Sequence, residues 1–278
     1  MTPPIHTFEH EAMKTTFTLR LENSDTQLNA QIVGAAFQLI DDIEQKLSRY
    51  IPGSDVWQIN HMKAGESLYV SDYCYGCMRA SLEAYQQTKG LFDITLGAII
   101  EHKKNEAEGD APAITGQIMV DPERPAIHCI EAGREIDLGG IGKGYTLDKI
   151  AELLKSFGIQ SALISAGAST QLAFGNKNWT IKLGSDPVSQ NFELNDQALS
   201  ASGTLVQGSH IIFPVTETPS EGAYISPNVW VVHKSGALAD AWSTAAMFIE
   251  TSDFELFEEL PPTIFIQHSG QISRFDNR

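Results

Sequence analysis

The sequence predicts an α+β fold, built as one domain over residues 1–278. Strand-like alternation and helix-like spacing of apolar residues both occur along the chain, but they do not follow one another in a regular βαβ order. Apolar residues make up 42% of the composition, which supplies a core and excludes a disordered chain. A chain of 278 residues is long enough to bury that core without disulfides.

The charge balance restricts the classes of partner. Lys and Arg total 19 and Asp and Glu total 35, which gives a net charge of −16. Nucleic acid and anionic lipid repel such a polyanion, so we expect neither as a partner. No stretch reaches the roughly 18 apolar residues of a membrane helix, so no membrane insertion is expected. The N-terminal residues resemble no export signal, which predicts a cytoplasmic protein; a signal trimmed from this chain stays an open alternative.

The first two elements are predicted from periodicity. Residues 13–21 alternate as a half-buried strand does. Residues 27–47 carry apolar side chains at the spacing of an amphipathic helix, namely Ile32, Ala35, Ala36, Leu39, Ile40, Ile43 and Leu47.

The next segment combines a capped helix with a charged stretch. Ser71 or Asp72 is expected to cap a helix that runs to about Lys89, and Gly90 would close it. Residues 101–112 are charged and poor in apolar side chains, so we expect them to form an exposed excursion.

The second half alternates short strands with two helices. A strand is expected to end at 136–138 and to lead through a glycine-rich turn into a helix that Gly158 closes. A further helix is predicted from Ala239 to about Glu250. Strands are predicted at 161–164, 179–183, 210–214, 228–233 and 263–267.

The glycine-rich turn at residues 139–144 is the strongest local motif. Glycines let a backbone approach a ligand closely, and the start of a helix favours an anion, to which Lys143 could add charge. The spacing fits neither a P-loop nor a Gly-x-Gly-x-x-Gly dinucleotide motif. Phosphate binding and a plain strand-to-helix turn therefore both stay open.

Asp240, Ser243 and Thr244 form a second motif. Positions i, i+3 and i+4 share one helical face, and one carboxylate with two hydroxyls suits Mg²⁺ better than zinc or iron. A helix cap with two small residues at a tight interface is the alternative.

Three further features have a functional and a structural interpretation. Asp93 follows a glycine turn and could bond a ribose or an adenine, or simply form a turn. His210 stands at a strand end, where a structural role is common. Cys74 and Cys77 lack further zinc ligands nearby, so we expect half-buried residues, with zinc binding or redox chemistry as alternatives.

Seven motifs resemble the ApbE family, the FAD:protein FMN transferases, in their order and spacing. The resemblance covers about residues 9–268. The motifs are Met13-x-Thr15-Thr16-Phe17, Leu47-Ser48-Arg49-Tyr50, Gly90-x-Phe92-Asp93-Ile94-Thr95, the Asp137–Tyr145 stretch, Ser202-Gly203, His210-Ile211-Ile212-x-Pro214 and Ala239-Asp240-Ala241-x-x-Thr244-Ala245.

The resemblance implies a two-lobed α+β fold with mixed or antiparallel sheets and packed helices. It implies a reaction in which a Ser or Thr hydroxyl of an acceptor flavoprotein attacks the FMN phosphorus of FAD, with Mg²⁺ on the diphosphate and AMP as the leaving group. Phosphoryl transfer depends mostly on positioning and charge neutralisation, which glycine amides and a hard cation supply.

The resemblance also assigns residues by matching position. Mg²⁺ would be held by Asp240, Ser243 and Thr244 with a backbone oxygen near Gly140, and His210 would be the acid/base. Tyr50 and Tyr145 would stack or pack nearby. FAD would be lined by Met13, Leu91, Phe92, Asp93, Asp137, Lys143 and Ile212.

Departures from the family pattern leave alternatives to transfer. Phe213 stands where the family has an Asp, which removes a carboxylate beside His210, and Lys14 occupies a usual glycine. Loss of an acid/base group costs about 10²–10⁴-fold in rate, which slows an enzyme rather than silencing it. The alternatives are a catalytically impaired FAD-binding paralogue and a Mg²⁺-dependent FAD pyrophosphatase that yields FMN and AMP.

Overall fold

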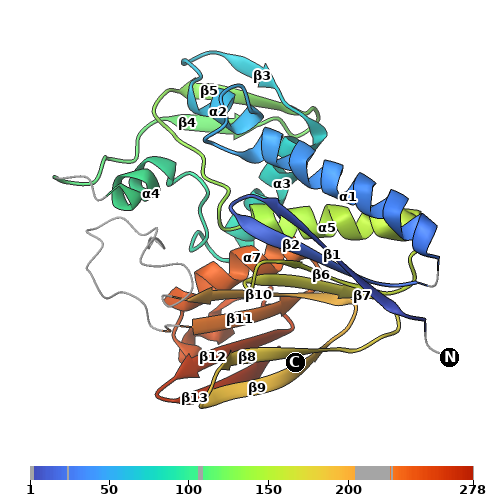
Figure 1. Cartoon of the computed structure of the whole chain (residues 1–278). Coiled ribbons are helices and arrows are strands. Elements are labelled where there is room, and N and C mark those ends of the chain that lie inside the picture. The colour runs from blue at the N-terminus through green and yellow to red at the C-terminus, as the bar shows by residue number, and fades with distance from the viewer. Residues whose placement is uncertain (1–2, 24, 106–108, 204–225, 227, 278) are drawn as a thin grey trace.

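The computed structural model describes residues 3–277 apart from 24, 106–108, 204–225 and 227. It confirms the α+β class, because helices and antiparallel sheets are both present without βαβ repetition (Figure 1). The main sheet has eight strands. Their order is β1 (Ile5–Ala12), β2 (Thr15–Glu22), β6 (Ala162–Ala166), β7 (Thr170–Phe174), β10 (Gln197–Gly203), β11 (Asn228–His233), β12 (Thr263–His268) and β13 (Gln271–Asp276). Each strand pairs antiparallel with its neighbours.

Helices cover one face of this sheet, and a hairpin covers the other (Figure 1). The helices that contact the sheet are α1 (Thr26–Leu47), α5 (Gly142–Ser156) and α7 (Gly236–Ala245), and α3 (Asp72–Gln87) packs on α7 and α1. The hairpin consists of β8 (Trp179–Ser185) and β9 (Val188–Leu194), whose apolar side chains pack under the sheet. Two short 3₁₀ helices, η1 (Ala246–Phe248) and η2 (Thr251–Leu256), follow α7.

A smaller lobe lies beyond α1 and α3 (Figure 1). Its three-stranded sheet has the order β3 (Ser67–Tyr69), β5 (Ala126–Glu131) and β4 (Gln117–Val120). Helices α2 (Asp55–Asn60) and α4 (Gly97–Lys104) belong to the same part of the chain.

The predicted helices form for the reasons their sequences give. The apolar positions of α1 at Ile32, Ala36, Ile40 and Ile43 are all fully buried, as amphipathic spacing requires. Ser71, rather than Asp72, caps α3 and accepts a hydrogen bond from the Cys74 amide at 3.3 Å.

Several predicted boundaries are wrong, and the causes are local. The strand expected from residue 13 begins at Thr15, because Met13 and Lys14 form the tight turn of a β1–β2 hairpin. No strand ends at 136–138; this stretch is held by an isolated bridge between Leu96 and Glu135.

Two helix predictions also change. Helix α7 begins three residues before Ala239 because Ser235 caps it by accepting from the Leu238 amide at 3.3 Å, and it gives way to η1 well before Glu250. The expected excursion at 101–112 begins as the last turn of α4. The strand predicted at 210–214 lies outside the described residues.

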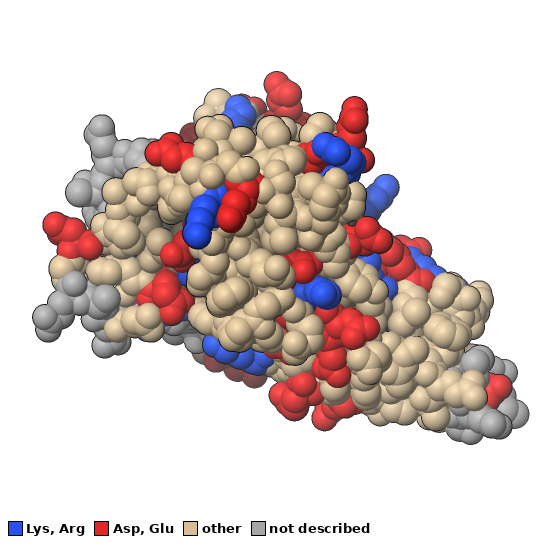
Figure 2. Space-filling model, turned by 90° about the horizontal axis from the view of Figure 1, so that it is seen from above, with Lys and Arg blue, Asp and Glu red and all other residues tan. Residues whose placement is uncertain are grey.

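The acidic character of the chain is visible on its surface. Figure 2 shows Asp and Glu side chains spread over the whole visible face, with Lys and Arg scattered among them. Within the part of the chain that is described, no helix combines the length and the apolarity needed to cross a bilayer.

Candidate active site

A buried carboxylate lies where α7 meets the main sheet. Asp240 is 4% exposed. Its Oδ2 accepts from the Gly144 amide at 3.1 Å, and its Oδ1 accepts from the hydroxyls of Ser200 at 2.9 Å and Thr170 at 3.3 Å. All three donors are neutral, and no described Lys, Arg or His forms an ion pair with this carboxylate. Asp240 is therefore a buried carboxylate whose hydrogen-bond partners among the described residues are all neutral.

The two hydroxyls predicted to accompany Asp240 lie beside it. Ser243 Oγ donates to the Asp240 carbonyl oxygen at 2.8 Å and lies 2.8 Å from Ser202 Oγ, which in turn lies 3.4 Å from Thr244 Oγ1. Gly140 approaches the same cluster, because a β-carbon there would lie 3.5 Å from Thr244 Oγ1. The structure thus brings Gly140, Asp240, Ser243 and Thr244 together.

This oxygen cluster fits a hard divalent cation by its chemistry. It offers a carboxylate, hydroxyls and a nearby backbone segment, which are the donor types that Mg²⁺ accepts. A buried charge left without a charged partner is costly, and a cation would compensate it. Among the described residues no group of three or more His, Cys, Asp or Glu side chains could hold a metal ion, so this cluster depends on one carboxylate together with hydroxyl and backbone oxygens.

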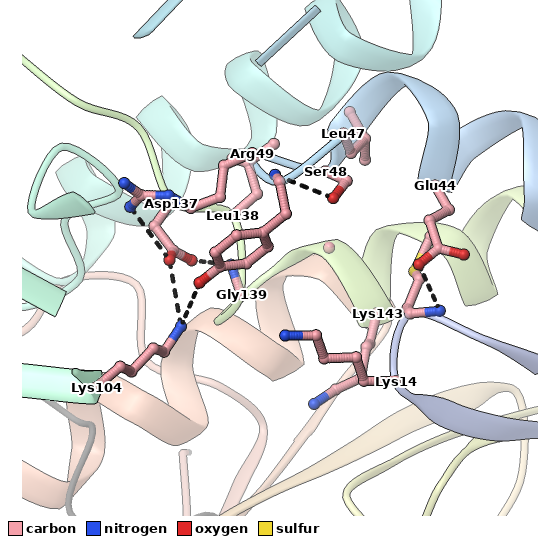
Figure 3. A pocket seen from close by; sticks show the side chains of 13 residues that line it. Lys14, Glu44, Leu47, Ser48, Arg49, Lys104, Asp137, Leu138, Gly139 and Lys143 are labelled. Atoms are coloured by element: carbon pink, nitrogen blue, oxygen red, sulfur yellow. Dashed lines mark hydrogen bonds and ion pairs between the residues drawn. The ribbon is translucent and has the colours of Figure 1, made fainter. Parts of the chain in front are cut away.

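A cavity of about 220 Å³ opens next to this cluster (Figure 3). The glycine segment links the two, because Gly139 and Gly142 line the cavity while Gly144 donates to Asp240. The lining comes from the β1–β2 turn, from the end of α1 and the residues after it, from the last residue of α4, and from the start of α5 and the residues before it. Its members are Met13, Lys14, Glu44, Leu47, Ser48, Arg49, Tyr50, Lys104, Asp137, Leu138, Gly139, Gly142 and Lys143.

Asp137 organises one wall of the cavity. Its Oδ1 accepts from the Gly139 amide at 2.7 Å, and its Oδ2 lies 3.5 Å from both Arg49 Nη1 and Lys104 Nζ (Figure 3). Arg49 also donates to Glu135 at 2.6 Å. Asp137 therefore fixes the turn that starts the glycine segment and holds two cations at the cavity wall.

Tyr50 faces the same wall, and burial and charge set its acidity. Its hydroxyl accepts from Lys104 Nζ at 3.3 Å and donates to Glu101 at 3.1 Å. Desolvation raises the pKa of Tyr50. Burial alone would lower the pKa of Lys104, but Asp137 and Tyr50 outweigh it, so the net pKa is raised and the ammonium stays charged.

The β1–β2 turn places two side chains on the opposite wall in an unusual backbone conformation. Met13 has φ 50° and Lys14 has φ 58°, in a two-residue hairpin loop where Asn and Gly are the usual residues. Such left-handed geometry costs about 1–2 kcal/mol for each residue with a β-carbon. Glu44 stabilises the turn by accepting from the Met13 amide at 2.9 Å.

The remaining predicted residues are divided between this site and other places. Phe92 is buried, with its ring beside Gly140, and half-buried Leu91 precedes it. Asp93 lines a different cavity and accepts from the Thr95 amide at 2.8 Å, as a turn residue does. His210 and Ile212, like Phe213, lie outside the described residues.

The predicted neighbours and cysteines also separate. Tyr50 lines the cavity, whereas Tyr145 is buried against α3, where its hydroxyl meets Gly76. Cys74 and Cys77 are free and completely buried rather than half-buried. Desolvation raises the pKa of both thiols, so neither is an activated thiolate.

Sequence reasoning missed five side chains at the site. Glu44 gave no signal beyond the polarity of a helix surface, and Lys104 fell in the stretch expected to form an exposed excursion. Ser200 and Thr170 sit on central strands, where a polar residue facing the helices could have drawn attention. Lys14 appeared only as a departure from the family pattern and not as a site residue.

Comparison with known proteins agrees with this fold and motif arrangement. The ApbE family model matches residues 13–265. The chain is 24% identical over 238 residues to "FAD:protein FMN transferase" from Vibrio cholerae, covering 76% of this chain and 71% of the relative. It is 24% identical over 281 residues to the protein of the same name from Salmonella typhimurium, covering 90% and 80%.

Solved structures show the same fold. The apo form of the Pseudomonas stutzeri flavinyl transferase ApbE superposes with a TM-score of 0.82 at 22% identity and covers 99% of this chain and 95% of its own. The ApbE protein of Thermotoga maritima gives a TM-score of 0.78 at 21% identity, with 98% and 97% covered. Since the family model spans most of the sequence and the fold agrees along its whole length, the chain belongs to the ApbE family.

Proposed function

We propose that this protein transfers FMN from FAD to a Ser or Thr hydroxyl of an acceptor protein, with Mg²⁺ required and AMP released. The buried carboxylate of Asp240, whose described hydrogen-bond partners are all neutral, carries the proposal, because it lies beside the glycine segment that also lines a basic cavity. Relatives named FAD:protein FMN transferase support the same reaction.

The reaction balances as a single displacement at phosphorus. The acceptor oxygen bonds to the phosphorus of the FMN half, and the bond from that phosphorus to the bridging oxygen breaks. AMP leaves with the bridging oxygen, and the hydroxyl proton passes to a base, for which His210 is the candidate by family position. Mg²⁺ on the oxygen cluster would neutralise charge on the diphosphate.

The chain's own residues have defined tasks in this proposal. The glycine segment lets the backbone approach the diphosphate, and the start of α5 directs amides toward it. Asp137 holds that segment through the Gly139 amide and keeps Arg49 and Lys104 at the wall. Asp240, Ser243 and Thr244 supply the oxygens that a cation needs.

Product analysis tests the proposal. The protein is incubated with FAD, Mg²⁺ and an acceptor protein that the Vibrio cholerae relative modifies. The Vibrio cholerae relative itself serves as the positive control. We expect the acceptor to gain the mass of one FMN residue, one AMP per modified acceptor, and no reaction in EDTA. AMP and FMN without acceptor modification would indicate a pyrophosphatase instead, and FAD binding without any AMP would indicate a non-catalytic flavin-binding protein.

The same assay measures the consequence of Phe213. A carboxylate beside His210 could accept the hydroxyl proton or orient the imidazole, and a phenyl ring can do neither. We expect Phe213→Asp to raise the transfer rate by at least about tenfold, and by no more than the 10²–10⁴-fold that a positioned acid/base group contributes. Efficient transfer by the unmodified protein, with no gain in Phe213→Asp, would contradict this role.

A further inference from the structure

The four cations that line the cavity fall into two classes. Arg49 and Lys104 face carboxylates, because both lie 3.5 Å from Asp137 and Arg49 also bonds Glu135. Lys14 and Lys143 have no carboxylate oxygen within 4.0 Å among the residues that are described. The first pair is therefore neutralised by the protein, whereas the second pair leaves positive charge in the cavity.

The two unneutralised lysines come from two different elements. Lys14 belongs to the turn between β1 and β2, and Lys143 belongs to the first turn of α5. Figure 3 shows both side chains extending into the same part of the cavity. On a chain of net charge −16, two free ammonium groups converging on one cavity form a local site for an anion.

Lys14 occupies a turn position whose backbone conformation is unfavourable for a residue with a side chain. Its φ of 58° lies in the region that favours glycine, and strained positions of this kind concentrate where a side chain has a function. The aliphatic stem reaches across the opening, and the ammonium lies 4.6 Å from the centre of the Tyr50 ring. The ring holds the ammonium by a cation–π contact and leaves its donors free for a ligand.

We propose that Lys14 and Lys143 together form a clamp for the diphosphate of the bound dinucleotide, and that Lys14 determines affinity for diphosphate ligands. This inference rests on the proposed function for the identity of the ligand. Each ammonium would donate to a diphosphate oxygen, one from the hairpin turn and one from the start of α5.

Binding and turnover of three Lys14 variants test the clamp. For Lys14→Gln we expect the Kd for FAD and for ADP to rise about tenfold, because a charge-assisted hydrogen bond is lost. Lys14→Arg should stay within about threefold of the wild type. Lys14→Gly should bind as weakly as Lys14→Gln yet melt at a higher temperature, because glycine relieves the left-handed backbone.

Lys89→Gly is the matched control. Lys89 also has a left-handed backbone, with φ 53°, but its ammonium bonds the Leu256 carbonyl and lies away from the cavity lining. We expect its ADP affinity to equal that of the wild type. Unchanged affinity in Lys14→Gln, or a lower melting temperature in Lys14→Gly together with weaker binding, would overturn the clamp.

The outcomes separate the clamp from the proposed function. Lysine-dependent ADP binding in a protein that never modifies an acceptor would refute the transferase proposal and support the clamp. Normal FMN transfer, with a KM for FAD that is the same in the Lys14 variants as in the wild type, would refute the clamp and support the transferase proposal.

Discussion

At the scale of single residues, Asp240 plays a structural part in the packing of the fold and an electrostatic part in the site. It accepts from one amide and two hydroxyls, and so joins α7 to α5, β7 and β10. Removal of its side chain would leave those donors unsatisfied, which costs about 1–3 kcal/mol for each buried group. Alanine at this position would therefore lower the stability of the fold as well as weaken metal binding. Asn separates the two effects better, because it keeps the shape of the side chain.

Asp240→Asn tests the electrostatic part. The amide keeps one acceptor oxygen and the side-chain shape but loses the negative charge, so we expect Mg²⁺-stimulated turnover to fall at least about 100-fold. Turnover against Mg²⁺ concentration measures this loss, and a melting curve shows that the variant is folded.

Asp148→Asn provides the matched control. Asp148 is a half-buried carboxylate on the same α5–α7 pair, and it accepts from the Gly236 and Ala237 amides at 2.6 and 3.0 Å. Its substitution should lower the melting temperature but keep the Mg²⁺ dependence. Equal Mg²⁺ dependence in both variants would exclude Asp240 as a metal ligand.

At the scale of elements, the crossing of α5 and α7 fixes the site. Gly144 and Gly236 face each other where the helices cross, and a β-carbon on either would collide with the backbone of the other. This close approach lets the Gly144 amide reach Asp240. Asp148 adds a second tie, because it receives the first amides of α7.

Gly144→Ala should separate the two helices. Overpacking of a tight contact costs about 1–3 kcal/mol, and the shift would also break the amide bond to Asp240. We therefore expect a lower midpoint in urea and weaker Mg²⁺ stimulation together. Gly34→Ala is the comparison, since nothing lies within 4 Å of its β-carbon position on α1 and Ala should add about 0.5–1 kcal/mol of helix stability. A Gly144→Ala protein as stable as the wild type would contradict the close approach of α5 and α7 at this position.

At the scale of the whole molecule, the charge distribution favours one kind of ligand. The chain carries a net charge of −16, yet the cavity lining holds four basic side chains against two carboxylates. A basic pocket on an acidic protein concentrates small anions. The contrast between the negative charge of the whole chain and the basic lining of the cavity therefore favours a small anionic ligand.

FAD should bind more tightly than FMN. Its diphosphate carries a second phosphoryl group into the basic cavity, and its AMP half adds contacts that FMN lacks. We expect at least about a tenfold lower Kd for FAD, the effect of about 1.4 kcal/mol, and a preference that shrinks as salt rises. Flavin fluorescence quenching measures both constants. Equal affinity for the two flavins at low salt would contradict a site built around the diphosphate.

The sequence by itself determined several of the helices and strands and the shared helical face of the oxygen cluster. The helical cores of α1, α3 and α5 follow from apolar spacing and end signals, and the face shared by Asp240, Ser243 and Thr244 follows from helical periodicity alone. These features depend on residues within one or two helical turns, so a linear pattern contains them.

Only the tertiary structure decided which distant residues complete the site. Ser200 and Thr170 meet Asp240 across 40 and 70 positions of sequence, and Lys104 reaches Asp137 across 33. The same packing placed Asp93 on another cavity and turned residue 14 into a cavity wall. The physical reason is that strand pairing and helix crossing set these distances, and neither is encoded in the spacing of residues within a single element.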